Sequence, residues 1–331
     1  MNLSFAVDID ALSEKYPDAS LALTIHERVL SEWRGHGTLI HPCKDLMKSP
    51  LIRAIDNLPM GLKKRWQEAL KRNKRRACLV DWDGSFPQNS ADEMMHLIGQ
   101  FQIALLESTR ACVAGGVGED DCSRIANELK GMELCKFHSV SNSSSFSAAR
   151  ILSEAPLEKG QNCKDEWKRR YTSWIRLSSW AVLVDRYAMS NHLSRNRRME
   201  VSGLDRFLRD AIARPIAESV RIRIFVARQP EHTNADVDEF CESIRSHYVG
   251  GAVKELHIHI LKDREFGDIA HHRSLRLDYM IFGFDKGIDS FGGEFSSQNY
   301  VLWRKDLAAH RTFESEEAML KACSNDSRQL L

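Results

Sequence analysis

The sequence lacks long apolar segments, because no stretch approaches about 18 uncharged apolar residues, the length at which a bilayer-spanning helix becomes a candidate. The first residues also lack the basic region followed by an apolar region that marks a secretory signal. We therefore expect no transmembrane segment and predict a cytoplasmic protein.

The eight cysteines include no C-x-x-C pair and are widely spaced along the chain. That usage is typical of reduced, mostly buried thiols rather than of a disulfide framework. Cys122, Cys135 and His138 do not match the spacing of a zinc module, and a fourth ligand is not evident. We therefore predict no disulfides, no structural metal and no cofactor.

The chain also has little excess charge, with a net charge of +1 over 331 residues, of which 43% are apolar and 28% charged. This composition is that of an ordinary globular protein with enough apolar residues for sizeable cores. The length favours two domains over one. We predict an N-terminal domain over 1–160 and a C-terminal domain over 165–331.

Strand and helix patterns alternate in both halves, which predicts two α/β domains. In the first half we expect a helix over 18–34 capped by Asp18, a strand over 38–40, helices over 44–57 and 60–75, strands over 77–80, 101–107 and 132–137, and a serine-rich loop over 139–147. In the second half we expect a helix from 165, strands over 180–184, 221–226 and 253–261, helices over 203–213 and 236–247, a turn around Gly267 and a buried strand over 279–284.

Eight cations lie within the fourteen residues from 63 to 76, in and just after the predicted helix 60–75, which is therefore strongly basic. Smaller clusters occur at 168–170 and 195–198. Clustered Lys and Arg can bind phosphates, and the alternative is a solvated helix face. The predicted nucleic-acid contacts are Lys64, Arg65, Lys71, Arg72, Arg75 and Arg76.

The segment from His271 to Asp278 reads HHRSLRLD and fits the pattern H-x-[K/R]-x4-D. A histidine can attack a phosphodiester, a cation two residues later on a strand shares its face and can hold phosphate oxygens, and a later carboxylate can orient an imidazole. We predict that His271, Arg273 and Asp278 act in this way. Asp185 and Arg186 follow the predicted strand 180–184, where ligands usually bind in open α/β sheets, and we predict that they complete the pocket.

Four features occur in order over about 180–305: Asp185 with Tyr187, the segment 203–208, the pair His271-x-Arg273, and the segment 286–291. Together they resemble the phospholipase-D-like domain that follows MIT domains in ESCRT-associated proteins, and related predicted nucleases of bacterial conflict systems. The resemblance implies a mixed sheet flanked by helices and a metal-independent phosphodiesterase, a hydrolase acting on nucleic acid. It also implies a role in antiviral defence or as a toxin-like effector, with a protein partner in a multi-component system.

The chain departs from that family in two respects. A phospholipase-D site normally pairs two copies of the motif, and here only His271 stands at the required spacing, so a two-histidine site would need a homodimer. Arg273 replaces the usual lysine, which keeps the charge and adds bidentate phosphate recognition. The eukaryotic relatives are thought to bind membranes or partners, so the alternative function is an inactive module that binds phosphate, nucleic acid or a partner.

Two further groups could carry chemistry. His257 and His259 share one face of a predicted strand, which suits either metal ligation or a polar strand face. A second alternative is a metal-dependent nuclease in the N-terminal domain, as in PIN-like proteins. Its acidic cluster would be drawn from Asp8 or Asp10, Glu27, Asp81, Asp83 and Glu107.

Overall fold

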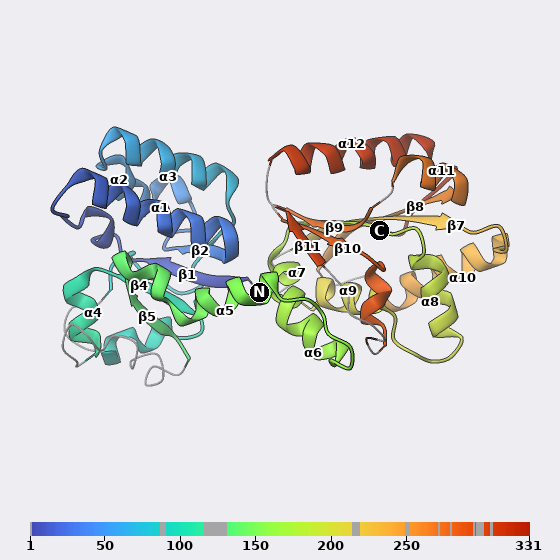
Figure 1. Cartoon of the computed structure of the whole chain (residues 1–331), viewed down its shortest axis with the longest axis horizontal. Helices are drawn as coiled ribbons and strands as arrows, with labels where there is room; N and C mark the ends of the chain where they lie inside the picture. The colour runs from blue at the N-terminus through green and yellow to red at the C-terminus, as the bar shows by residue number, and fades with distance from the viewer. Residues whose placement is uncertain are drawn as a thin grey trace. The chain divides into compact units, whose positions relative to one another are not determined.

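The computed structural model describes residues 2–86, 91–115, 131–213, 219–248, 252–270, 272–278, 280–293, 295, 301–304 and 307–331. The chain divides into two compact units, Met1–Glu154 and Ala155–Leu331 (Figure 1). Each unit contains one β-sheet with a hydrophobic core on either face, which confirms the α/β class. No described helix is both long and apolar enough to cross a membrane.

The sheet of the first unit is parallel throughout and has the order β3-β2-β1-β4-β5. The order reverses between β1 and β4, so the carboxyl ends of these two strands border the crevice in which such sheets bind ligands. The strands are β1 (Leu3–Val7), β2 (Gly37–His41), β3 (Arg75–Ala77), β4 (Ile103–Leu106) and β5 (Glu133–Lys136).

The first helix of this unit begins at a side-chain cap. Asp18 accepts a hydrogen bond from the Leu21 amide at 2.7 Å and begins α1, as its sequence predicts. One core lies under α1, α2, α3 and α5, and a second lies under the segment 91–97 and α4 on the other face. The bounds are α1 (Ala19–His36), α2 (Pro50–Asp56), α3 (Met60–Arg72), α4 (Ser108–Gly115) and α5 (Ser144–Glu154).

Two predictions for the first unit are wrong. The apolar run 77–80 is not a strand, because β3 ends at Ala77 and the chain leaves the sheet with Leu79 72% exposed. The serine-rich segment 139–147 is not a loop but a 3-10 turn followed by the start of α5. The carboxylate of Glu133 accepts from the amides of Ser144 (2.8 Å) and Ser145 (3.0 Å), which supplies partners that the first turn of a helix otherwise lacks.

The sheet of the second unit is mixed, as predicted, and its described strands have the order β11-β10-β9-β6-β7-β8-β12. β6, β7 and β8 are parallel, β9, β10 and β11 form an antiparallel meander beside β6, and β12 pairs antiparallel with β8. The strands are β6 (Trp180–Val184), β7 (Val220–Arg228), β8 (Val253–Lys262), β9 (Arg273–Leu277), β10 (Met280–Phe284), β11 (Val301–Arg304) and β12 (Asp326–Gln329).

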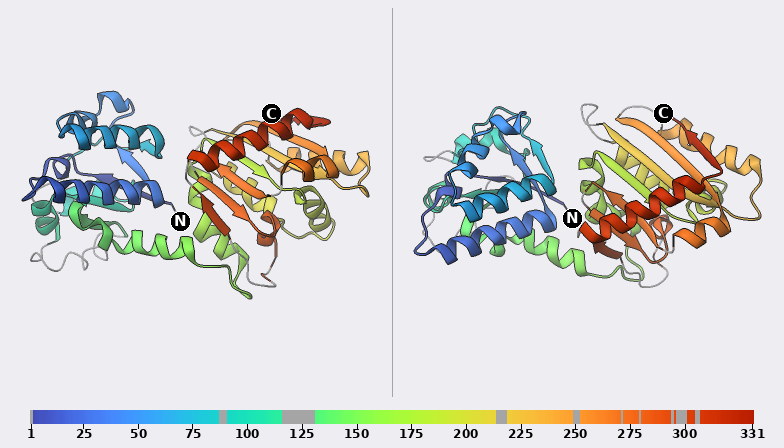
Figure 2. Two further views of the ribbon diagram at one scale, coloured as in Figure 1. Left: turned by 45° about the horizontal axis from the view of Figure 1, so that its top comes forward. Right: turned by 90° about the horizontal axis from the view of Figure 1, so that it is seen from above.

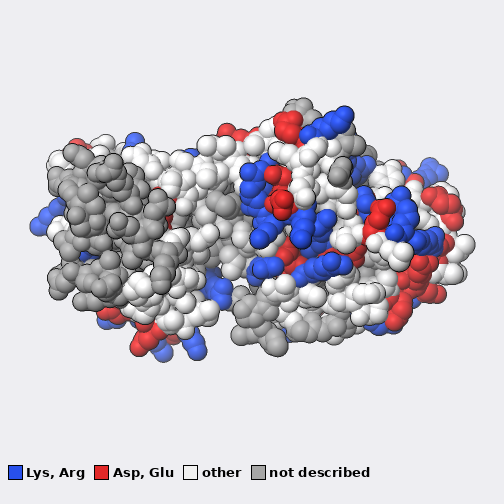
Figure 3. All heavy atoms as spheres, turned by 90° about the horizontal axis from the view of Figure 1, so that it is seen from below, with Lys and Arg blue, Asp and Glu red and all other residues white. Residues whose placement is uncertain are grey.

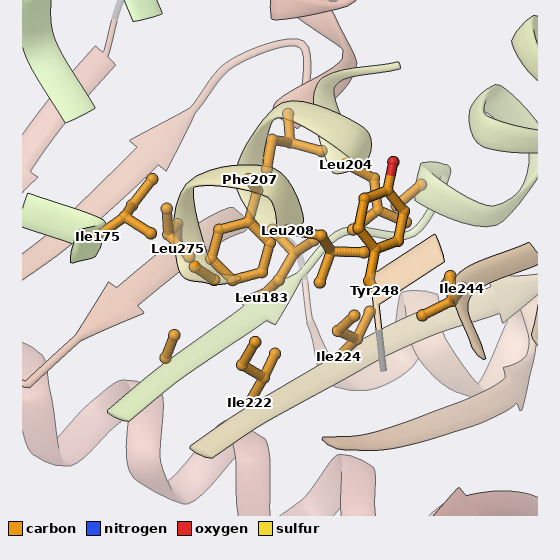
Figure 4. Close-up of a cluster of buried hydrophobic side chains, with 14 of the residues drawn as sticks. Ile175, Leu183, Leu204, Phe207, Leu208, Ile222, Ile224, Ile244, Tyr248 and Leu275 are labelled. Carbon is orange, nitrogen blue, oxygen red and sulfur yellow. The ribbon is translucent and has the colours of Figure 1, made fainter. Parts of the chain in front are cut away.

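The larger core of the second unit lies between this sheet and α6 (Cys163–Trp167), α7 (Ser173–Leu177), α8 (Ala188–Asn196), α9 (Gly203–Ile212) and α10 (Asn234–Tyr248). A π-helical turn over 168–172 joins α6 to α7. Alternate strand residues point to one face, so Ile222 and Ile224 of β7 meet Phe207 and Leu208 of α9 (Figure 4).

The opposite face of this sheet is covered by α11 (Asp263–Ile269) and α12 (Leu307–Cys323), which carry the fully buried Phe266 and Leu320 (Figure 2). The turn predicted around Gly267 is therefore wrong, because the segment continues as the helix α11. Arg276 of β9 fastens α12 to the sheet through Glu317, with Nε donating to the carboxylate at 2.6 Å.

Candidate functional site

Asp185 lies at the carboxyl end of β6 and is 1% exposed. Its carboxylate accepts hydrogen bonds from the backbone amides of Tyr187 (3.0 Å) and Ile288 (2.8 Å). Burial raises the pKa of Asp185 to about 6, although the two amides and the nearby Arg273 act in the opposite direction. The aspartate therefore joins the end of β6 to the loop after β10.

Two glycines allow this loop to approach so closely. Gly287 has φ +78°, and a Cβ atom there would lie 2.5 Å from Oδ2 of Asp185. A Cβ atom on Gly203 would lie 1.9 Å from the carbonyl oxygen of Ile288. Asp289 completes the junction by accepting from the Gly203 amide (3.2 Å) and from Nε of Arg195 (2.8 Å). Residues from three of the four segments that carry the family resemblance thus meet here and hold the loop after β10 against the end of β6.

A small pocket opens beside this junction. Arg273 of β9 lies over the Tyr187 ring, with its guanidinium carbon 5.0 Å from the ring centre, a distance at which a cation and an aromatic face attract. Its Nη1 donates to the Asp285 carbonyl at 2.6 Å, and it forms no ion pair with a carboxylate of the described residues. The pocket is lined by Arg186, Tyr187, Phe266, Gly267, Ala270, His272 and Arg273.

Arg186 lines this pocket but is already engaged. Its Nε and Nη2 donate to the two carboxylate oxygens of Asp263 at 2.7 and 2.5 Å. Gly267 provides room for it, because a Cβ atom there would lie 2.9 Å from the Arg186 Nη1. Asp263 and Gly267 both belong to α11. Because a turn was predicted in place of this helix, the sequence did not indicate that these two residues contact Arg186.

The structure places Asp278 away from this pocket, so its predicted role in orienting a histidine there is wrong. Its carboxylate accepts from the amides of Ser179 (3.0 Å) and Trp180 (2.8 Å), at the amino end of β6. Asp185 follows the carboxyl end of the same strand, about 16 Å away for five extended residues. Asp278 therefore joins the turn between β9 and β10 to the start of β6.

His271 lies outside the described residues, so its predicted attack on phosphorus stays a prediction. The adjacent His272 is exposed and lines the pocket, and Arg273 begins β9. Of the predicted site residues that the structure describes, Arg186 and Arg273 line the pocket and Asp185 is buried at the end of β6.

The acidic residues predicted in the N-terminal domain converge only in part. Asp8, after β1, is 0% exposed and accepts from Nη1 of Arg110 at 2.8 and 3.0 Å, while Nη2 of Arg110 donates to Asp10. Burial raises the pKa of Asp8 to about 6, against the effect of Arg110. Arg110 had no sequence motif to mark it.

The remaining predicted acids differ in their surroundings. Burial opposes ionisation of Asp83 and Glu107, but local hydrogen bonds and Arg110 outweigh it and lower both pKa values. Glu27 instead pairs with Arg65 on the helical layer, and Asp81 is exposed. In the described part of the chain no three His, Cys, Asp or Glu side chains are placed to hold a metal ion. The Arg110 guanidinium binds the central carboxylates instead.

The predicted basic helix corresponds to α3, which ends at Arg72, so Arg75 and Arg76 lie in β3 instead, and the predicted cations have different environments. Lys64, Lys71 and Arg75 are exposed, and Nη1 of Arg75 donates to the Leu70 carbonyl. Arg65 pairs with Glu27, and Arg72 pairs with Glu68 at 2.5 Å. Arg76 is half-buried. The positive charge of this surface therefore rests mainly on Lys64, Lys71 and Arg75.

The two strand histidines lie on one face of β8, where His259 is buried and stacks on Phe225. The rings of His257 and His259 stack with centroids 6.3 Å apart, and Nδ1 of His259 lies 3.0 Å from the Ser327 hydroxyl. Burial, followed by the neighbouring His257, Arg223 and Lys321, lowers the pKa of His259 to about 4.

No family model matches this chain, and no curated protein matches it. Among solved structures it is similar to TrmBL2, described as an archaeal chromatin protein with a novel mode of DNA binding. The identity is 12%, the match covers 61% of this chain and 66% of that chain, and the TM-score is 0.28. The chain thus spans just under two thirds of that protein's length, and the superposition is too poor to bear on function.

Proposed function

We propose that the C-terminal domain binds nucleic acid by holding a phosphate group in the pocket beside Tyr187. The observation that supports this most is Arg273, a half-buried guanidinium fixed over an aromatic ring, with no carboxylate partner among the described residues. Arginine presents several N–H donors in one plane, which matches two oxygens of a phosphate.

The surroundings of Arg273 suit an anionic ligand. Asp185, whose charge interacts with that of Arg273, accepts hydrogen bonds from the backbone amides of Tyr187 and Ile288 rather than from the guanidinium. Arg186 also lines the pocket, but its charge is balanced by the ion pair with Asp263. His272 is exposed at the rim, where an imidazole can donate to a phosphate oxygen.

The test is fluorescence anisotropy of labelled 20-nucleotide strands, alone and as duplexes, with the full chain. We expect Arg273→Gln to weaken binding at least fivefold, because one charge-assisted contact is lost. The matched control is Arg245→Gln on α10, which removes an exposed arginine far along the sequence from the pocket and should change binding less than twofold. Equal affinities for wild type and Arg273→Gln would reject the pocket.

Phosphodiesterase activity is the second candidate, because Arg273 of the motif lies in the pocket beside Asp185. It would require His271, and a two-histidine site would require a homodimer. Cleavage of the labelled strands by wild-type protein, lost in His271→Ala, would support it. Binding without cleavage, with or without Mg²⁺, would leave the phosphate-binding module as the function.

A further inference from the structure

One helical face of the second unit is formed by α6, the π-turn 168–172, α7 and α9. On this face most acidic side chains are buried and most cationic side chains are exposed. Its carboxylates Glu166, Asp205 and Asp210 are buried, at 5 to 8% exposure. In the same segments Arg206 is half-exposed, and the exposed charges are Asp165 and the cations Lys164, Lys168, Arg169, Arg176 and Arg209. The surface is therefore cationic although the segments contain several acids.

The buried acids are held inward by specific bonds. Asp210 accepts from Nε1 of Trp167 (2.7 Å), the Thr172 hydroxyl (2.6 Å) and Nη2 of Arg176 (3.0 Å). Asp205 accepts from the Ser202 amide at 2.7 Å as part of the capping box of α9 and also accepts from the Tyr248 hydroxyl. These acids fasten α9 to its neighbours and cannot turn outward without breaking those bonds.

The cations at the surface are not matched by acids to the same extent. Lys164, Lys168 and Arg209 form no ion pair among the described residues, and Arg206 bonds to the Phe291 carbonyl rather than to a carboxylate. Desolvation lowers the pKa of Arg206, and its neighbours Arg209 and Arg195 lower it further. Figure 3 shows Lys and Arg side chains gathered on this face of the unit. Like charges held this close together favour an anionic partner.

We infer that this face, the residues 164–176 and 206–209, docks on the phosphate backbone of a duplex nucleic acid. Its aromatic side chains Trp167, Tyr171, Trp174 and Phe207 are all buried, so none can stack on an unpaired base as single-strand binders require. None of the exposed large apolar side chains of the described residues lies in these segments, so the face lacks the apolar anchors of a membrane-binding helix. Cations without aromatics or apolar anchors suit the outside of a duplex.

This surface goes beyond the pocket proposed above, since none of its residues lines that pocket. The test compares two triple variants of the full chain that remove the same charge. One is Lys164→Gln, Lys168→Gln and Arg209→Gln on the face, and the control is Arg245→Gln, Lys254→Gln and Lys262→Gln on α10 and β8. Binding to labelled 20-base-pair DNA and RNA duplexes is measured by anisotropy between 50 and 250 mM salt, about the range over which such contacts weaken.

We expect the face variant to lose about tenfold or more in duplex affinity at the middle of this range and to reduce the slope of log affinity against log salt by about 2 to 3. The control should stay within twofold. Equal losses in both triples would show a response to net charge alone and would overturn the inference. Tighter binding to the single strand than to its duplex would also overturn it. So would a protein that binds anionic vesicles but no duplex, if the face variant abolishes the vesicle binding.

Loss of duplex binding in the face triple but not in Arg273→Gln would support this surface and reject the pocket. The reverse result would support the pocket and reject this surface. Thermal unfolding of both triples checks that the fold is kept, because all six side chains are exposed and should cost little stability.

Discussion

Each unit buries one aspartate after a central strand of its sheet, Asp8 after β1 and Asp185 after β6, and burial raises the pKa of both to about 6. Their partners differ. Both accept from two backbone amides, but Asp8 is bound by the guanidinium of Arg110 as well, whereas no cation of the described residues is bonded to Asp185, which leaves Arg273 at the pocket. A carboxylate that is hydrogen-bonded to an arginine occupies that arginine. A carboxylate that is held by amides without a bonded cation leaves the neighbouring arginine available for a ligand.

The largest expected effect comes from breaking the Asp8 contact. In Asp8→Ala the buried Arg110 loses its main partner, and we expect the first unit to lose about 3–5 kcal/mol of stability. Asp8→Ala with Arg110→Met should recover much of it, because no uncompensated charge remains. Urea unfolding of the full chain measures both, and Asp10→Ala, which removes a half-exposed partner, should cost under about 1 kcal/mol. A loss that small in Asp8→Ala would contradict the role given to the pair.

The junction at Asp185 depends on a close backbone approach rather than on an ion pair. Gly287→Ala introduces a Cβ atom at positive φ, which costs about 1–2 kcal/mol, and forces it against the Asp185 carboxylate, which adds about 1–3 kcal/mol. Gly160→Ala is the matched control, with φ +81° and open space around the new atom, and should show only the first cost. Equal unfolding midpoints for the two variants would mean that the approach is not tight.

The raised pKa of Asp185 makes a signed prediction for pH. The ordinary value is 3.8 and the folded value about 6, so the folded state holds the proton more tightly and stability falls as pH rises through this window. The share of Asp185 amounts to about 3 kcal/mol at most. The difference in urea midpoint between wild type and Asp185→Asn from pH 4 to 7 measures this decline, because the lowered pKa values of His192 and His259 contribute to the wild-type midpoint with the opposite sign. A difference that does not shrink as pH rises would refute the assignment.

The smallest expected effect is the difference between the two arginines in how strongly each shifts the pKa of its aspartate. Arg110 makes hydrogen bonds to Asp8, so Arg110→Gln should raise the pKa of Asp8 markedly. Arg273 acts on Asp185 only through space, so Arg273→Gln should raise the pKa of Asp185 slightly and leave stability nearly unchanged. The pH dependence of unfolding in each variant gives both values. A larger shift at Asp185 than at Asp8 would reverse the comparison.

Periodicity predicted most helices and strands of both units, and it placed β6 with both ends correct because the apolar run 180–184 has the length of a strand, is rich in aromatic and β-branched residues and has polar residues on both sides. It failed where distant groups decide local structure. Glu133 of β5 satisfies the first amides of α5, and Leu79 is apolar but follows the last residue of an edge strand. The segment around Gly267 forms a helix that packs through Phe266, a contact that no local pattern announces.

The sequence by itself determined that Asp185 and Arg186 leave a strand and that Arg273 stands two residues after His271. Only the tertiary structure decided which of these residues share a pocket. β9 runs antiparallel to β6 and is fully extended, so it places Arg273 beside the end that carries Asp185 and Asp278 at the other end of the sheet. Asp278 is five residues after Arg273, and that separation spans the whole length of β9, because an extended strand rises about 3.3 Å per residue.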